Sequence, residues 1–443
     1  MDQLIKFIVY NKTPESRNNL NYEAMRMRKR EKMLSPDGEF DKRLLLLSPD
    51  LERMYEERVL YARNKFLTTS KPAVTGGKPI TEELAIELRV TTFGTSTCPP
   101  RGEWIKSPLI MRPPDQPLSY GLTAPRNGAR SLLSGLQAHI IKWLLFDSRP
   151  LTKDNKSKEP PESYLRPSEE RQEEALWRAC SEVIWRCGGG FNTQNTSDTK
   201  VVVALPTDIT YVQHSAQYYQ DGITEKLHLF EFNSLEDLQI FIKRYMYVFQ
   251  SEEGAGALLL LYAAVLSRGC DNILKDLDGK LNYLVSTQVE GSINVTMLLL
   301  TGRATPYLHN GVMYVGDEDH YAMPQYGVLS RSSVGLLVWY GGDDNSSNIV
   351  IKQHPGSRLK TPALPIWVTC CSGHYGVFDI HYYTCGGCHV LLNVDTRTHE
   401  DEACGIRNDD ISATPLEKLI HTKWQDAKIT WTGVVPHFGE SPK

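Results

Sequence analysis

The stretch Pro125–Phe146, PRNGARSLLSGLQAHIIKWLLF, predicts a helix preceded by a glycine-containing turn. Asn127 and Gly128 are the turn residues, and apolar residues then recur three and four positions apart, the spacing of one helix face. These apolar residues are Leu132, Leu133, Leu136, Ile140, Ile141, Leu144 and Leu145. The segment is therefore expected to pack one apolar face into the core of the protein.

The first turn of this predicted helix carries Arg130. Enzymes with a thiol nucleophile place their cysteine at such a position, because the helix dipole and free N–H groups lower the thiol pKa and bind a developing oxyanion. A guanidinium stays protonated and cannot attack a carbonyl, and a cation at a helix N-terminus opposes the dipole. The segment therefore has the form of a nucleophile helix without a nucleophile.

Composition and charge narrow the class of protein. The chain has 443 residues, 41% of them hydrophobic and 23% charged, which is typical of a globular chain with a substantial core. The net charge of −4 and pI near 6.3 argue against general electrostatic binding to nucleic acid. The longest apolar run, Ala255–Leu266, is too short to span a bilayer. Nine cysteines, with no secretory signal at residues 1–11, predict reduced thiols in the cytosol or nucleus.

The chain divides into an N-terminal extension, residues 1–75, and a main domain, residues 76–443. Within the extension, the basic run Met25–Met33 predicts a solvated and partly disordered arm rather than a targeting element. Ser48 and Pro49 predict the start of a helix that continues to about Lys65. The main domain is expected to begin near Gly76.

The order of the predicted elements favours an α+β fold, with helices first and a strand-rich C-terminal half. Thr81 caps a predicted helix through Leu88, and Ser168 caps another that ends at Gly188. A helical pair, Ser234–Gln250 and Ala255–Ser267, follows two predicted strands, Val201–Leu205 and Lys226–Phe232. The later predicted strands are Ile349–Lys352, Ile366–Cys371, Tyr375–Tyr383, Val390–Val394 and Ile429–Thr432.

Several ordered motifs resemble one family, the longer branch of the MINDY deubiquitinases. Gln137-Ala138 and Leu144-Leu145-Phe146 align with the nucleophile helix of that family. Further matches are Gly77-Lys78-Pro79-Ile80, Phe93-Gly94, Leu298–Ala304, Arg331–Gly335, Pro365–Val368 with His374, and Thr422-Lys423-Trp424. The resemblance extends from about Gly76 to Pro436.

The resemblance implies a papain-like, MINDY-type cysteine peptidase fold and an activity toward lysine-48-linked polyubiquitin. It places His374 at the general-base position, Arg130 at the nucleophile position and Ala124 at the position of a glutamine that helps to hold the oxyanion. Since both Arg130 and Ala124 depart from the family pattern, the chain resembles a member that lacks the nucleophile and is inactive.

Three other residues are candidate substitutes for the missing nucleophile. Ser131 and Ser134 follow Arg130, but a helix turns about 100° per residue, so Ser131 is expected to point away from the base. A hydroxyl also needs an adjacent base more than a thiol does. Cys98 lies in a proline-rich loop, where a thiol without a catalytic role is the simpler interpretation.

Cys385-Gly386-Gly387-Cys388-His389 matches the motifs for haem attachment and for a redox dithiol. Its place between two predicted strands favours a hairpin turn with reduced thiols. Two alternatives stay open: a zinc site with Cys370, Cys371 or Cys404, although a second CxxC is missing, and a redox dithiol. We therefore expect no metal and no cofactor.

The sequence predicts a deubiquitinase homologue that binds ubiquitin, polyubiquitin or other proteins of the ubiquitin system without cleaving them, in the cytoplasm or nucleus, with no nucleic acid or membrane partner. Two alternatives stay open. One is an active isopeptidase with an unpredicted nucleophile, and the other is a scaffold that does not bind ubiquitin.

Overall fold

A computed structural model describes residues 5–6, 71–116, 118–123, 128–148, 164–191, 199–279, 283–316, 323–339, 354–371, 374–378, 382–383, 389–395, 414–424 and 428–432. The chain divides into two compact units, residues 1–10 with 74–443 and residues 11–73. Of the second unit, only residues 71–73 are described. The predicted extension of residues 1–75 thus contributes its first residues to the larger unit, where β1 (Ile5–Lys6) pairs with β11 (His389–Asp395).

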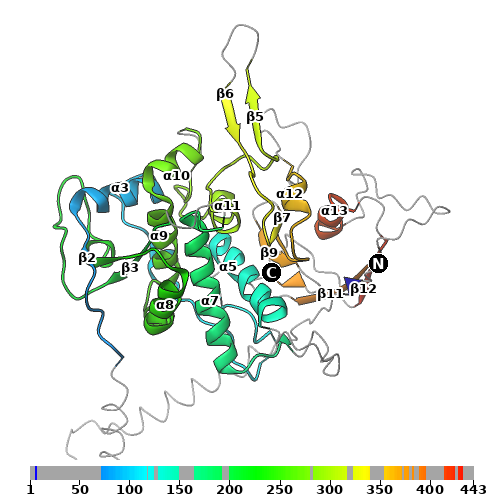
Figure 1. Ribbon diagram of the computed structural model, residues 1–443, viewed down its shortest axis with the longest axis horizontal. Coiled ribbons are helices and arrows are strands. Elements are labelled where there is room, and N and C mark those ends of the chain that lie inside the picture. Colours follow the sequence, from blue (N-terminus) through cyan, green and yellow to red (C-terminus); the bar gives the residue numbers. More distant parts are fainter. Residues whose placement is uncertain are drawn as a thin grey trace, which may run out of the picture. The chain divides into compact units, whose positions relative to one another are not determined.

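Helices dominate the first part of the larger unit and strands the second, which confirms the predicted mixed α+β class (Figure 1). The predicted strand Ile349–Lys352 lies outside the described residues. The helices are α3 (Glu82–Phe93), α4 (Gly102–Ile105), α5 (Arg130–Lys142), the π-helix η2 (Trp143–Asp147), α7 (Glu169–Cys187), the 3₁₀-helix η4 (Thr224–Lys226), α8 (Leu235–Gln250), α9 (Gly256–Arg268), α10 (Cys270–Asp276), α11 (Ile293–Thr301), α12 (Ser357–Lys360) and α13 (Pro415–His421).

The strands form three separate sheets. The strand order is β2-β4-β3 in the first sheet, β5-β6 in the second, and β1-β11-β10-β9-β8-β7 in the third, where β12 also pairs with β11. The pairs are antiparallel except for β7 with β8. The remaining strands are β2 (Lys78–Pro79), β3 (Val201–Pro206), β4 (Leu227–Phe232), β5 (Val312–Val315), β6 (Met323–Tyr326), β7 (Gly335–Trp339), β8 (Trp367–Cys371), β9 (His374–Phe378), β10 (Tyr382–Tyr383) and β12 (Lys428–Thr432).

The capping signals predicted several helix starts correctly. The Thr81 and Ser168 side chains accept hydrogen bonds from the first turns of α3 and α7, and Ser234 does the same for α8. These bonds satisfy backbone donors that have no partner within the helix. The end of α3 differs from the prediction, because the helix continues past Leu88 and stops at Gly94 in the left-handed conformation.

One predicted strand is two strands. The run Tyr375–Tyr383 reverses direction between Phe378 and Tyr382, so that β9 and β10 pair with each other. Residues that favour strands fill both halves of the run, and this composition alone does not show where the direction changes. The strands β10 and β11 also pair, as the predicted hairpin around the CGGC sequence requires, although residues 384–388 themselves lie outside the described residues.

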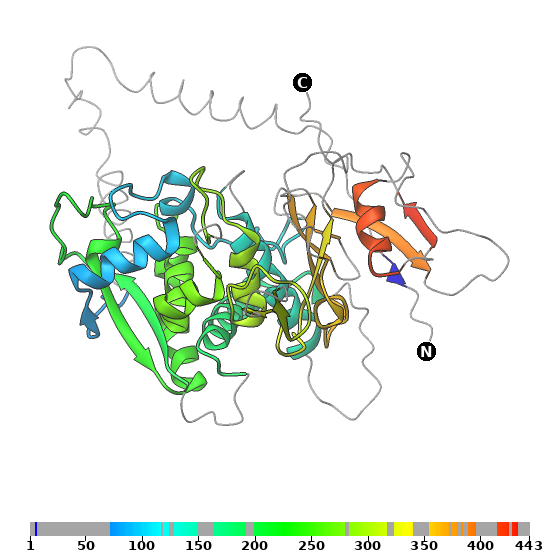
Figure 2. The same cartoon turned by 90° about the horizontal axis from the view of Figure 1, so that it is seen from above.

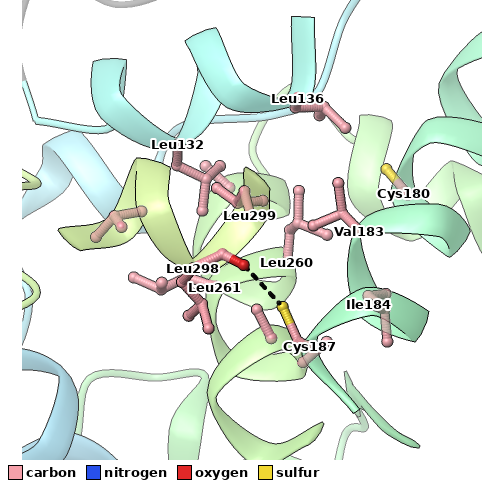
Figure 3. Packing of buried hydrophobic residues seen from close by; sticks show 14 of the residues in the cluster. Leu132, Leu136, Cys180, Val183, Ile184, Cys187, Leu260, Leu261, Leu298 and Leu299 are labelled. Carbon is pink, nitrogen blue, oxygen red and sulfur yellow. Dashed lines mark hydrogen bonds between the residues drawn. The ribbon is translucent and has the colours of Figure 1, made fainter. Parts of the chain in front are cut away.

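The helices α5, α7 and α9 lie between two of the sheets. On one side α9 packs against β3, and on the other α5 packs against β8 and β9 (Figure 2). Figure 3 shows how α5, α7, α9 and α11 meet in the core: Leu132 of α5 lies beside Leu299 of α11, and the Cys187 thiol donates to the Leu298 carbonyl at 3.6 Å. The helix α5 is thus a central element of the core.

The longest apolar run forms α9, whose residues Gly256–Val265 are buried in the core. Among the described residues, no single helix has the length and hydropathy of a membrane span. The consecutive helices α9 and α10 meet those criteria only as a pair, and they are bent by 87°.

Two pairs of the family motifs make contacts between distant elements. The motif Leu298–Ala304 contains the end of α11, which stops at Gly302. In the motif Arg331–Gly335, the Ser332 hydroxyl donates a hydrogen bond to the Leu300 carbonyl at 2.7 Å. Near the C-terminus, the Lys423 ammonium lies over the rings of Trp367 and Trp424, 5.1 and 4.7 Å from their centroids. These motifs hold the fold together rather than forming a catalytic group.

The β5–β6 hairpin exposes apolar side chains on both of its faces. Tyr314 is 72% and Met323 is 65% exposed, and Val312, Met313, Val315 and Tyr326 are also exposed. None of the eight residues in the two strands is charged. The hairpin is therefore a surface with unusually high apolar content.

Gly302→Ala and Gly94→Ala form a matched pair that tests the α11 motif. Both glycines end a helix with φ near +75° (77° and 74°), but a Cβ at Gly302 would lie 2.4 Å from the Arg186 carbonyl oxygen, whereas a Cβ at Gly94 meets nothing within 4 Å. Gly94→Ala is expected to lower the free energy of unfolding by ~1–2 kcal/mol through left-handed strain. Gly302→Ala should cost a further ~1–3 kcal/mol from the steric clash. Denaturant unfolding measures both, and equal losses would contradict the proposed contact.

Candidate functional site

Arg130 is the first residue of α5. The residue before it, Ala129, makes no side-chain hydrogen bond to the helix, and the first turn contains no acidic residue. Gly128 has φ of +84°, and a Cβ there would lie 2.6 Å from the Glu103 Cβ. The predicted turn therefore needs glycine at 128 both for its backbone conformation and for close packing.

A tight loop, residues 285–291, holds the turn in front of α5. The Gly291 N–H donates to the Gly128 carbonyl at 2.9 Å, and Val285 bridges to Gly291. The Trp104 indole N–H donates to the Val289 carbonyl at 2.8 Å. This loop was not predicted to belong to the site, because its contacts are with residues more than 150 positions away.

Gln137 fixes the segment that leads toward position 124. Its side chain is buried, accepts a hydrogen bond from the Leu122 N–H at 2.7 Å and donates to the Tyr120 carbonyl at 2.8 Å. The sequence shows Gln137 only as part of the family motif, whereas its structural role is to hold this segment against α5. Ala124 lies outside the described residues.

His374 is the first residue of β9, and its backbone is opposite Cys371 of β8. Since β9 packs against α5, the structure brings the strand that begins at His374 beside the helix that begins at Arg130 (Figure 1). The His374 side chain lies outside the described residues, and its role as a base stays a prediction.

Two side-chain donors in the first turn of α5 lack acceptors among the described residues. The Arg130 Nε is buried and has no hydrogen-bond partner there, and the same is true of the Ser131 hydroxyl. Ser131 is fully buried and its hydroxyl lies against Gly291, where a Cβ would be only 2.2 Å away. The turn therefore presents positive charge and unsatisfied donors.

A family model described as "Deubiquitinating enzyme MINDY-3/4, conserved domain" matches residues 89–433. The chain belongs to the MINDY-3/4 deubiquitinase family. This match covers most of the chain, including Arg130, Gln137 and His374.

The MINDY-3/4 relatives agree with this assignment. The chain is 30% identical over 383 residues to "Probable ubiquitin carboxyl-terminal hydrolase MINDY-4" of Xenopus tropicalis, covering 81% of this chain and 47% of that protein. It is 28% identical over 433 residues to the human protein of the same name, covering 92% and 53%. With human "Ubiquitin carboxyl-terminal hydrolase MINDY-3" it shares 24% identity over 268 residues, covering 57% and 55%. The chain spans about half the length of these relatives, and no solved structure matches it.

Most thiols of the described residues are unsuited to replace a MINDY-type nucleophile. Cys180, Cys187, Cys270 and Cys370 are buried, and Cys98 is exposed. Burial raises the pKa of Cys187 to about 12 and of Cys270 to about 11, and it also raises the pKa of Cys180. A thiol with so high a pKa supplies almost no thiolate near neutral pH.

The described residues contain no group of three His, Cys, Asp or Glu side chains placed to hold a metal ion. Cys385 and Cys388 lie outside the described residues, as do Cys404 and the Cys371 side chain. The hairpin and zinc interpretations of the CGGC sequence therefore both stay predictions.

A pocket of about 570 Å³ lies at the opposite end of α5 from Arg130. Its walls come from η2, α7 and the start of α8, and include Lys142, Asp147 and Glu182. Lys142 pairs with both carboxylates, at 2.6 and 2.9 Å. Since α5 has 13 residues and rises ~1.5 Å per residue, about 18 Å separate this pocket from the first turn.

His139 lies beside this pocket, fully buried in α5. Its Nδ1 is 2.9 Å from the Gly135 carbonyl oxygen, which indicates that Nδ1 carries the proton, and its Nε2 is 3.9 Å from a Glu182 carboxylate oxygen. Burial is the main cause that lowers the pKa of His139 to about 4. Burial opposes ionisation of Glu182, but the charges around it, including Lys142 and Arg186, lower its pKa to about 2.

His139 should make the protein acid-sensitive. Because its pKa is about 4 when folded and near 6.5 when unfolded, the unfolded state binds more protons between these values. The contribution of neutral His139 to the free energy of unfolding is fully present above pH 6.5. It is lost as the pH falls toward 4, by up to ~3 kcal/mol. His139→Leu should flatten the dependence of the unfolding free energy on pH in this window, whereas His214→Leu, at an exposed histidine, should not. Denaturant unfolding at several pH values gives the slopes, and an unchanged slope in His139→Leu would refute the assignment.

Proposed function

We propose that this chain is a deubiquitinase homologue that recognises ubiquitin, in particular lysine-48-linked polyubiquitin, without cleaving it. Its MINDY-3/4 relatives carry names that describe ubiquitin carboxyl-terminal hydrolases. The family resemblance supports the preference for lysine-48-linked chains. The reduced cysteines and the proposed role in the ubiquitin system support a location in the cytosol or nucleus.

The observation that carries the proposal is Arg130 at the first position of α5. A thiol there would gain thiolate character from the helix dipole and attack the isopeptide carbonyl. The guanidinium has no lone pair available for attack at any pH at which the protein is folded. The family's oxyanion glutamine is also replaced, by Ala124.

The burial of the candidate substitutes supports the loss of cleavage. Ser131 follows Arg130, but its side chain is fully buried against Gly291. The thiols Cys180, Cys187 and Cys270 are buried with raised pKa values. An active isopeptidase would therefore need Cys98 or a residue outside the described part of the chain.

The framework around the missing nucleophile supports a retained binding role. The turn before α5 is held by Gly291, and the segment before position 124 is held by Gln137. Neither contact uses the nucleophile, so losing it does not require losing the surface that recognises ubiquitin.

Purified protein is expected to cleave no ubiquitin dimer faster than a buffer blank does, because position 130 supplies no nucleophile. A gel-based cleavage assay with dimers of each linkage measures this, and a pulldown on the same chains measures binding. Turnover that disappears in His374→Ala would overturn the proposal, since it would show a working base. Failure to capture any ubiquitin would instead favour the scaffold alternative.

Restoring the two family residues tests the position of the site. Arg130→Cys with Ala124→Gln would place a thiol at the helix N-terminus and return a donor that is worth roughly 3–4 kcal/mol in other enzymes. The double variant should react through the new thiol with a ubiquitin probe bearing a C-terminal electrophile. Turnover should stay poor, because neighbouring residues have also changed.

The matched control for the revertant is Arg101→Cys, which places a thiol at an exposed residue before the four-residue helix α4. Adding His374→Ala to the double variant should slow its labelling. If the thiol at position 130 reacts no faster than the thiol at position 101 in a folded protein, position 130 is not the nucleophile position, although the family assignment would stand.

A further inference from the structure

The pocket at the C-terminal end of α5 is shaped by the π-helix η2. The Ser148 N–H donates to the Trp143 carbonyl at 2.9 Å, five residues earlier, whereas an α-helix uses the carbonyl four residues earlier. Single π-turns are rare, and they frequently lie at functional sites. In this turn the Asp147 carboxylate meets the Lys142 ammonium five positions before it, and both side chains line the pocket.

Each of the three carboxylates among the described residues of the pocket is already paired with a cation. Asp147 and Glu182 pair with Lys142 at 2.6 and 2.9 Å, and Glu182 also pairs with an arginine outside the pocket at 2.7 Å. Glu174 pairs with the Nε of Arg178 at 2.9 Å. The pocket therefore has no unpaired carboxylate there to attract a cationic ligand.

Arg171 is the cation of this pocket that no carboxylate of the described residues pairs with. One of its guanidinium nitrogens donates to the Ser148 hydroxyl at 2.9 Å, and its guanidinium carbon lies 5.6 Å from the centroid of the Tyr164 ring. These contacts orient the side chain but supply no negative charge. Most N–H donors of Arg171 therefore remain available to an anion that enters the pocket.

The pocket also has an apolar wall, to which Trp143, Phe191 and Leu235 contribute. Phe191 is 49% exposed, so much of its ring is available for contact. The volume of about 570 Å³ falls within the range of sites for small organic molecules, roughly 300–1,000 Å³, and exceeds what a single inorganic ion fills. The pocket therefore suits a molecule that has both a charged group and an apolar body.

We propose that this pocket binds a small organic carboxylate, whose charged end pairs with Arg171 and whose apolar body packs against Phe191 and Leu235. The planar guanidinium matches the two oxygens of a carboxylate. One unpaired cation among three carboxylates favours a singly charged ligand over a phosphate, whose second charge the carboxylates would repel. The site lies about 18 Å from the first turn of α5, so this inference does not rest on ubiquitin recognition.

The test compares four ligands with a shared phenyl group on the full chain at neutral pH: 3-phenylpropionate, its neutral amide, 3-phenylpropylamine and phenyl phosphate. Ligand-detected NMR titrations give the dissociation constants. The carboxylate is expected to bind at least ~tenfold more tightly than the amide, the effect of losing a hydrogen bond between charged groups. The amine and the phosphate should also bind more weakly than the carboxylate.

Three variants locate the site. Arg171→Gln should abolish the difference between carboxylate and amide, while Arg166→Gln, at an exposed arginine that does not line the pocket, should preserve it. Leu235→Trp should weaken the carboxylate and the amide alike by filling the space for the apolar body. Circular dichroism reports whether each variant is folded. Equal binding of the carboxylate and the amide, tightest binding of the amine or the phosphate, or binding of none of the four by the wild-type chain would overturn the inference, as would a difference that persists in folded Arg171→Gln.

Discussion

Burial of α5 is the constraint on which the structure depends. Every residue from Ser131 to Ile141 is buried, because α7 and α11 cover one side of the helix and β8 and β9 cover another. A helix enclosed in this way cannot shift or rotate without disrupting the core. Its first residue, Arg130, is therefore held in one place.

The framework contacts explain why family membership is compatible with the proposed loss of catalysis. Gln137, Gly291 and Gly302 each serve packing or backbone geometry, and none of them needs a thiol at position 130. The motifs that identify the family are largely such contacts. A chain can therefore keep the MINDY-3/4 framework with an arginine at position 130.

Local signals in the sequence predicted the elements well where capping and periodicity coincide. The starts of α3, α7 and α8 follow from Thr81, Ser168 and Ser234, whose side chains bond to the neighbouring turn. The reversal between β9 and β10 was missed, because strand-forming residues continue on both sides of it. The loop at residues 285–291 was missed for a different reason: it reaches the site through contacts with Gly128 and Trp104, which no local pattern records.

The enclosure of α5 also sets how its amide protons exchange with solvent. From Leu133 onward each N–H has an acceptor four residues earlier, beginning with the Ala129 carbonyl at 2.9 Å, so these protons exchange when the core as a whole opens. The amides of Arg130, Ser131 and Leu132 precede that ladder. The helix thus divides between Leu132 and Leu133 into a short first turn outside this ladder and a long segment whose exchange reports on the stability of the entire domain.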